Sequence, residues 1–305
     1  MAIDNMQKIT KLESVTQYNQ LRGVKTLHPL VTMVDLSKAA PMPAQTFHFG
    51  LYAIYLKELE CGELSYGRSK YDYQEGTLVF VAPGQILGVQ PKVKTFQPKG
   101  WALLFDPELI RGTSLGRNMK DYSFFSYEVN EALHLSDHER EIVIDCFRKI
   151  QLELSIGIDK HSRTLISSNI ELFLNYCQRF YDRQFITREN VNKGILERFE
   201  NLLSSYFNSD LPLNNGIPTV SYCAKELNLS SNYFGDLIKK ESGISAFDYI
   251  RTIIIDRAKD KIFESEKSIT DVAYELGFKY PQHFTRLFKQ KVGLAPSEYK
   301  QAKNN

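Results

Sequence analysis

The sequence predicts two domains of different class. The first is an N-terminal α+β domain, a β-barrel followed by two helices, and the second is a C-terminal all-α domain in which one pair of helices occurs twice. Three observations support this. The chain has 305 residues, enough for two hydrophobic cores. Residues 30–105 contain short β-type runs separated by turns, and the C-terminal part repeats one apolar pattern 49 residues apart.

Six segments of the N-terminal part have the composition of strands, because they are rich in aromatic and β-branched residues. Turn residues such as Gly76 and the pair Pro83-Gly84 separate them. Many short strands at this spacing favour a small barrel or sandwich. The predicted strands are Leu30–Leu36, Thr46–Leu56, Gly62–Tyr66, Thr77–Val81, Ile86–Gln90 and Gly100–Phe105, with Phe124–Val129 as one more edge strand.

Two helices are predicted after the strands. Ser136 and Glu139 have the spacing of a capping box at the start of the first, and residues 160–183 form the second. Both have broad apolar faces, which would cover the barrel. The polar residues 186–194 are the predicted linker between a domain at 1–185 and a domain at 195–305, which opens with a helix at 195–207.

The clearest pattern of the C-terminal part begins at Ser268. Ser268 and Asp271 have capping-box spacing, and Gly277 marks a helix end because it tolerates positive φ. Pro281 suits the first position of the next helix. That helix has one apolar face, formed by Phe284, Leu287 and Phe288, and one polar, basic face. A short helix, a tight turn and a second helix with a polar outer face is the layout of a DNA-binding helix-turn-helix.

The same unit occurs once before. Thr219, Ala224, Leu227, Asn228 and Leu229 match Ser268, Ala273, Leu276, Gly277 and Phe278; after a one-residue insertion, Phe234, Leu237, Ile238, Lys239 and Gly243 match Phe284, Leu287, Phe288, Lys289 and Gly293. The pattern predicts helix-turn-helix units at about 219–243 and 268–293, joined by a helix at 246–263 whose apolar side includes Phe247. Such a helix would let both second helices enter neighbouring major grooves, about 34 Å apart.

Residues from about 197 to 303 resemble the AraC/XylS family of bacterial transcription regulators. The signature reads A-Y-E-L-G-F, then F-T-R-L-F-K, then G-L-A-P-S-E-Y. Residues 73–85 resemble the cupin-type sensor half of the same regulators. The resemblance implies a sequence-specific, ligand-responsive transcription regulator that binds double-stranded DNA, forms a homodimer through the helices after the barrel and contacts RNA polymerase. An activator is the expected type.

Base contacts are predicted mainly from the second unit. Gln282 and Arg286 lie one turn apart on the outward face, where the family's motif places base contacts, and their side chains suit adenine and guanine. Lys279, Tyr280, Thr285 and Lys289 are predicted as backbone contacts or support. The matching positions of the first unit are Ser231, Asn232, Gly235, Asp236 and Lys239. Gly235 has no side chain and Asp236 repels phosphate, so base reading there is expected to be sparse or centred on Asn232.

The positive charge is concentrated in one short segment of the C-terminal part. The net charge is only +2, which excludes a general polyanion-binding character. Residues 279–292 nevertheless contain Lys279, Arg286, Lys289 and Lys291 and no acidic residue. The second unit is therefore predicted to supply more of the salt-dependent attraction to phosphate.

The barrel is expected to hold a small molecule of unknown identity. The candidate lining residues are Phe47, Phe49, Tyr52, Tyr66 and Trp101, with Tyr55, Phe80 and Phe105 as further candidates. No cofactor or metal is predicted, because the six histidines are scattered and Pro83-Gly84 is followed by Gln85 rather than by the histidine usual in cupin metal sites. The sequence therefore does not predict an enzyme.

Two alternatives stay open: a cupin enzyme whose C-terminal helices serve another purpose, and an interaction module that docks its helical repeat on another protein. The four cysteines form no C-x-x-C pair, and Cys146, Cys177 and Cys223 fall on apolar helix faces, which favours reduced thiols. No signal peptide or membrane-spanning run is visible. A cytoplasmic protein without a membrane partner is expected.

Overall fold

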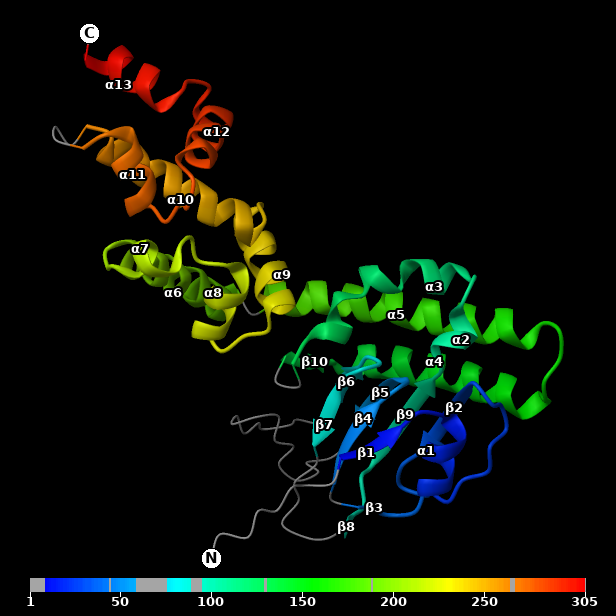
Figure 1. Cartoon of the computed structure of the whole chain (residues 1–305). Coiled ribbons are helices and arrows are strands. Elements are labelled where there is room, and N and C mark those ends of the chain that lie inside the picture. Colours follow the sequence, from blue (N-terminus) through cyan, green and yellow to red (C-terminus); the bar gives the residue numbers. More distant parts are fainter. Residues whose placement is uncertain are drawn as a thin grey trace, which may run out of the picture. The chain divides into compact units, whose positions relative to one another are not determined.

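The chain divides into two compact units, residues 1–187 and 188–305 (Figure 1). The computed structural model describes residues 9–43, 45–58, 76–88, 95–128, 131–187, 189–263 and 267–304. Much of the predicted linker at 186–194 is helical, because α5 ends at Thr187 and α6 begins at Glu189.

The described strands of the first unit form three sheets. The five-stranded antiparallel sheet has the order β10-β6-β5-β9-β2, the three-stranded sheet the order β1-β4-β7, and β3 pairs with β8. Their bounds are β1 Ile9–Leu12, β2 Val31–Asp35, β3 Met42–Pro43, β4 Thr46–Phe49, β5 Tyr52–Lys57, β6 Thr77–Val81, β7 Ile86–Gly88, β8 Thr95–Phe96, β9 Gly100–Phe105 and β10 Leu133–His134. This sheet-rich unit agrees with the predicted class.

One hydrophobic core lies between the five-stranded sheet and the smaller sheets. The large sheet contributes alternate residues such as Ala53, Val79 and Ala102, and β4 contributes Phe47 and Phe49. Helix α1, Val15–Leu21, closes this core with Val15 and Tyr18. This helix is not among the predicted elements, although Ser14 and Gln17 form its capping box.

Two long helices, α4 Asp137–Ile156 and α5 Ser162–Thr187, run along one side of the strands (Figure 1). The predicted capping box of Ser136 and Glu139 is present at the start of α4. Helix α4 packs on β2 and α5 on β10, so both lie against the outer face of the five-stranded sheet. The short helices α2 Pro107–Ile110, α3 Ser114–Asn118, η1 Met119–Asp121 and η2 Ser123–Ser126 precede them.

The predicted edge strand at 124–129 is wrong over its described residues. Phe124 and Phe125 belong to the 3₁₀ helix η2, and Val129 lies outside the described residues. Both phenylalanines are buried, and their rings pack on Phe80 at 4.5 and 5.4 Å between centroids. A strand would turn two consecutive side chains to opposite faces, so burying both against one sheet requires a helical turn.

The predicted single strand at 46–56 is also wrong. It is divided into β4 and β5 at Gly50 and Leu51, and the two strands belong to different sheets. The Gly50 N–H donates to Leu12 O at 2.8 Å, and Leu51 is buried. The chain turns here because Leu51 enters the core while β5 joins the opposite sheet. The predicted strand at 62–66 and Cys61 lie outside the described residues.

The second unit is helical. Its elements are α6 Glu189–Phe207, α7 Leu211–Asn215, α8 Val220–Glu226, α9 Ser231–Ser242, α10 Ala246–Lys261, α11 Ile269–Glu275, α12 Pro281–Val292 and α13 Pro296–Asn304. Helix α10 lies between the pair α8–α9 and the pair α11–α12 (Figure 1). Cys223 is buried here, as Cys146 and Cys177 are in the first unit.

Candidate nucleic-acid interface

The two helix pairs have the same turn at the level of the backbone. Asn228 has φ 59° and Gly277 has φ 90°, and Asn228 is the one non-glycine residue with positive φ in the part of the chain that the structure describes. In the first turn the Leu229 N–H donates to Ala224 O at 2.9 Å, and in the second Phe278 N–H donates to Ala273 O at 3.0 Å. The predicted match of Asn228 with Gly277 is confirmed.

The ends of the two second helices match as well. Gly243 ends α9 with φ 76° and donates to Lys239 O at 3.0 Å, while Gly293 ends α12 with φ 89° and donates to Lys289 O at 2.9 Å. The predicted caps of the first helices are present too, since Thr219 accepts from Tyr222 N and Ser268 from Asp271 N.

The pairs differ where the second copy has one more residue. Ser230 caps α9 by accepting from Tyr233 N at 3.2 Å. Helix α12 begins instead with Pro281 after Tyr280, which makes no side-chain cap bond. Lys279 Nζ lies 5.7 Å from the centroid of the exposed Tyr280 ring. The longer turn therefore presents a cation and an aromatic ring beside the start of α12.

Each second helix is anchored by one apolar face. Helix α9 buries Phe234, whose ring meets that of Phe199 from α6 edge-on at 4.9 Å. Helix α12 buries Phe284, whose ring lies 5.4 Å from Phe278 and 5.8 Å from Phe288. Because the buried faces follow the helical period, the remaining side chains of both helices turn outward.

Most of the predicted DNA contacts are exposed on these outward faces. In the second copy Gln282, Arg286, Lys289, Lys279 and Tyr280 are exposed, and in the first copy Ser231, Asn232 and Lys239 are exposed. Thr285 is half-buried, and its hydroxyl donates to Pro281 O at 3.2 Å within the helix. Asp236 is half-buried, and a Cβ added to Gly235 would meet open space.

Two polar clusters hold α10 in place. Glu275 at the end of α11 receives Lys261 Nζ at 2.7 Å and Lys267 Nζ at 2.8 Å. Burial raises the pKa of Glu275, but the hydrogen bonds and charges of the two lysines outweigh it and leave this pKa below its usual value. Arg257 donates to Asn208 Oδ1 at 2.7 Å and to Ser204 O at 3.3 Å. These polar contacts connect α10 with α11 and with the end of α6.

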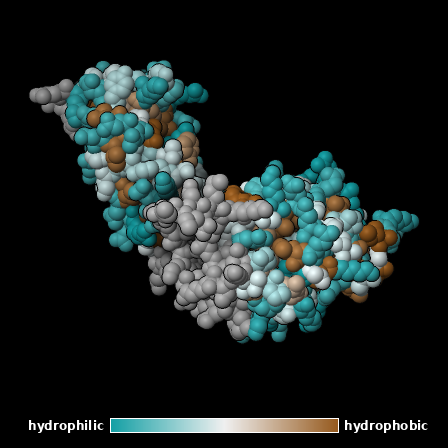
Figure 2. All heavy atoms as spheres, turned by 60° about the horizontal axis from the view of Figure 1, so that its bottom comes forward, coloured by the Kyte–Doolittle hydropathy of each residue, from teal (hydrophilic) through white to brown (hydrophobic). Residues whose placement is uncertain are grey.

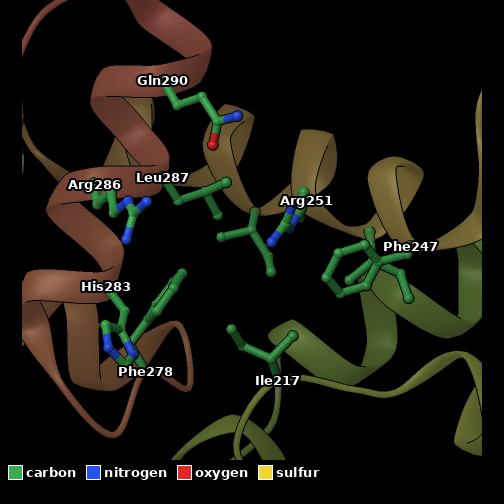
Figure 3. Close-up of a pocket in the computed structure, with 10 residues that line it drawn as sticks. Ile217, Phe247, Arg251, Phe278, His283, Arg286, Leu287 and Gln290 are labelled. Atoms are coloured by element: carbon green, nitrogen blue, oxygen red, sulfur yellow. The ribbon is translucent and has the colours of Figure 1, made fainter.

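An open groove of about 370 Å³ lies between α10 and α12 (Figure 3). Arg251, His283, Arg286 and Gln290 surround an apolar floor that includes Leu287. Of these four polar residues, only Arg286 was predicted from the sequence as a site residue. The signal available for His283 was its outward position beside Gln282, whereas nothing in the local sequence places Arg251 near α12.

Phe247 also lines this groove and corrects an expectation. It was predicted on the apolar side of the connecting helix, and 52% of it is exposed. The Arg251 guanidinium carbon lies 4.0 Å from the centroid of its ring. Arg251 thereby covers the ring that the helix leaves outside the core.

The candidate ligand residues of the first unit do not gather in one place. Phe47 and Phe49 lie in the core between the sheets, with ring centroids 6.3 Å apart. Tyr52 packs outside that core, on Phe105 at 5.0 Å and Phe125 at 5.2 Å. Trp101 is half-buried on β9, at alternate positions from the core residues Ala102 and Leu104, and Tyr66 lies outside the described residues. Of the further candidates, Tyr55 packs against the core, while Phe80 and Phe105 lie on the outer face.

The described residues contain no group of three or more His, Cys, Asp or Glu residues arranged to hold a metal ion. They also contain no helix with the length and apolar character needed to cross a membrane.

Comparison with known proteins identifies the second unit. A family model described as a helix-turn-helix domain matches residues 223–302. The uncharacterized HTH-type transcriptional regulator YtdP of Bacillus subtilis is 30% identical over 113 residues, which cover 37% of this chain and 14% of that protein. The HTH-type transcriptional activator RhaS of Escherichia coli is 27% identical over 81 residues, which cover 27% of this chain and 29% of RhaS.

The chain therefore spans less than a third of the length of these two relatives. Among solved structures, the C-terminal domain of the two-component response regulator yesN from Fusobacterium nucleatum is 25% identical, with a TM-score of 0.31, and the match covers 34% of this chain and 95% of that domain. The sequence matches carry the conclusion that the second unit is a helix-turn-helix domain of the AraC type.

Proposed function

We propose that this chain is a transcription regulator that reads DNA with both of its helix-turn-helix units, placing α9 and α12 in adjacent major grooves of one duplex. The observation that carries this proposal is the repeated frame: both units have the same turn and the same αL end, and both leave a polar face outside. DNA binding and transcription regulation are supported by the AraC-type domain, since YtdP and RhaS bear the names of transcriptional regulators.

The second copy contributes more of the attraction to phosphate. Lys279, Arg286 and Lys289 are exposed and form no ion pair within the described residues, whereas Lys291 Nζ lies 4.0 Å from Asp248 Oδ1. Helix α9 carries Asp236 on its outward side, which opposes Lys239. Because phosphate contacts set affinity and base contacts set specificity, α12 dominates the affinity of the complex.

Arg286 and Lys289 make different contributions that one experiment separates. Arg286→Ala is expected to lose about 1–3 kcal/mol at one base position, because it removes a bidentate contact to a base edge. Lys289→Ala is expected to weaken binding to every sequence alike and to reduce the slope of affinity against salt by about one. The measurement is fluorescence anisotropy with a duplex selected from random sequence and its single-base variants, at several salt concentrations. Unchanged base discrimination in Arg286→Ala would show that α12 faces the DNA differently.

The first unit supplies dimerisation in this proposal. Helices α4 and α5 expose large apolar side chains, of which Leu152 (60%), Ile156 (69%) and Leu165 (44%) lie toward their connecting turn and Leu172 (41%) lies farther along α5. Figure 2 shows hydrophobic surface at that end of the unit. We expect a homodimer through these helices, since several large apolar side chains exposed on neighbouring helices are typical of an interaction site. Sedimentation of the full chain at micromolar concentration tests it, and a monomer both with and without DNA would refute it.

The remaining parts of the proposal rest on the resemblance to the family. The first unit binds a small-molecule effector, and the chain contacts RNA polymerase in the cytoplasm. It acts as an activator, as RhaS does according to its name. Mapping bound DNA across the genome with and without candidate metabolites tests the effector and identifies the targets together.

A further inference from the structure

Arg22 is a buried cation in the core of the first unit. It follows α1, and its side chain has no exposed surface. Its Nη2 donates to Leu36 O at 3.3 Å, while Nε and Nη1 are buried without a hydrogen-bond partner. No ion pair involving Arg22 is found in the described part of the chain, so its guanidinium charge is uncompensated there.

The groups beside Arg22 do not neutralise it. The hydroxyls of Tyr18 and Tyr55 are hydrogen-bonded to each other, and burial raises the pKa of Tyr18 to about 12 and that of Tyr55 well above its usual value. Both phenols are therefore neutral at physiological pH. Arginine does not lose its proton in proteins, so the site holds one net positive charge.

A second buried polar side chain near Arg22, that of Asn19 on α1, also has an atom without a hydrogen-bond partner in the described part of the chain. The Asn19 side chain is fully buried, and its Nδ2 donates to Thr26 Oγ1 at 3.0 Å, but its Oδ1 accepts no hydrogen bond from any described residue. Asn19 on α1 lies three residues before Arg22, the C-cap residue of the helix, which places the two on one side of its end. Buried polar groups in native proteins are normally satisfied, and an exception of this kind often marks a site for a group that comes from outside.

We infer that the core of the first unit binds a small organic acid, whose carboxylate accepts from the Arg22 guanidinium and whose hydroxyl donates to Oδ1 of Asn19. A single negative charge matches the single guanidinium, whereas the second charge of a phosphate would have no partner. A carboxylate also suits the donors of a guanidinium better than a spherical ion does. This inference rests on the proposed ligand-responsive function and names the class of ligand.

The experiment measures thermal unfolding and calorimetric binding of the full chain with a panel of sodium salts at equal ionic strength: lactate, acetate, phosphate and chloride. Lactate is expected to raise the Tm of the first unit by several degrees in a saturable way, acetate to do so at higher concentration, and the other two not to. No rise with either carboxylate, or an equal rise with chloride or phosphate, would overturn the inference.

Variants then assign the effect to Arg22. Arg22→Met is expected to abolish the shift with lactate, and Asn19→Leu to make the lactate response resemble that of acetate. Arg111→Met is the matched control, because it makes the same chemical change at a side chain that is 76% exposed. Should Arg22→Met fail to fold, Asn19→Leu and the calorimetry of the unmodified chain decide, since Asn19→Leu is expected to remove the difference between lactate and acetate.

The DNA affinity of the unmodified chain, measured without any organic acid, keeps the two proposals apart. Intact DNA binding with no carboxylate response refutes this inference alone. Loss of lactate binding in Arg111→Met, or an unchanged lactate response in Arg22→Met, would refute the assignment to Arg22.

Discussion

Gly277→Ala is expected to destabilise the second helix-turn-helix unit strongly, although it adds only one methyl group. Gly277 has φ +90°, and a Cβ built there would lie 2.7 Å from Gly216 C and 2.8 Å from Ile217 N. A left-handed conformation costs an L-residue about 1–2 kcal/mol by itself. The clash is with backbone, which cannot rotate away as a side chain can, so the total loss is expected to be on the order of 3 kcal/mol or more.

Hydrogen bonds fix the backbone at Gly216, which a Cβ at residue 277 would meet. Gly216 has φ +79°, its N–H donates to Pro212 O at 2.9 Å, and its carbonyl accepts from the Tyr206 hydroxyl at 2.9 Å. Relief of the clash would have to break these bonds or move α11. We therefore expect Gly277→Ala to lose protection against hydrogen exchange in α11 and α12, with a matching loss of DNA affinity.

Two other glycines, Gly293 in the second helix-turn-helix unit and Gly235 in the first, separate the contributions. Gly293 has φ +89° with no atom within 4 Å of an added Cβ, so Gly293→Ala reports the backbone cost alone. Gly235 lies within α9 with open space around it, so Gly235→Ala is expected to stabilise the helix by up to about 1 kcal/mol. If Gly277→Ala costs no more than Gly293→Ala, the close approach to Gly216 is not what limits residue 277.

The sequence predicted the second unit well because its signals are local. The cap at Ser268, the turn at Gly277 and the start at Pro281 each depend on residues only a few positions apart. The repeat strengthened the prediction of the turn, because Asn228 matches Gly277 in the sequence and both residues have positive φ. The outward position of Gln282 and Arg286 follows from the helical period alone.

The first unit was less predictable because its features depend on distant contacts. The division of 46–56 into two strands follows from which sheet each half joins, and the 3₁₀ turn at Phe124 from packing on Phe80. The burial of Arg22 is of the same kind, because a lone arginine after a short helix is normally exposed. Arg251 was not predicted as a site residue, because only the packing of α10 on α12 brings it beside Arg286.

Phe284→Ala is expected to cost about 3–5 kcal/mol, the range for removing a buried phenylalanine ring. Phe284 has no exposed surface, and the rings of Phe278 and Phe288 lie within 6 Å of it. The cavity would loosen α12 from the turn that presents it. Phe284→Leu is the matched control, because it keeps an apolar side chain and should retain much of the stability and most of the DNA affinity.

Phe234→Ala makes the equivalent change in the first copy, where Phe234 is also fully buried and packs on Phe199. The two alanine variants should lose similar protection against hydrogen exchange in α9 and in α12, respectively. Their DNA affinities should differ, because α12 and its turn carry the exposed cations Lys279, Arg286 and Lys289, whereas α9 carries Asp236 beside Lys239. Phe284→Ala should therefore weaken binding more and reduce its dependence on salt more. Equal losses of affinity and of salt dependence would mean that both helices contribute alike to phosphate binding, against the asymmetry of charge between them.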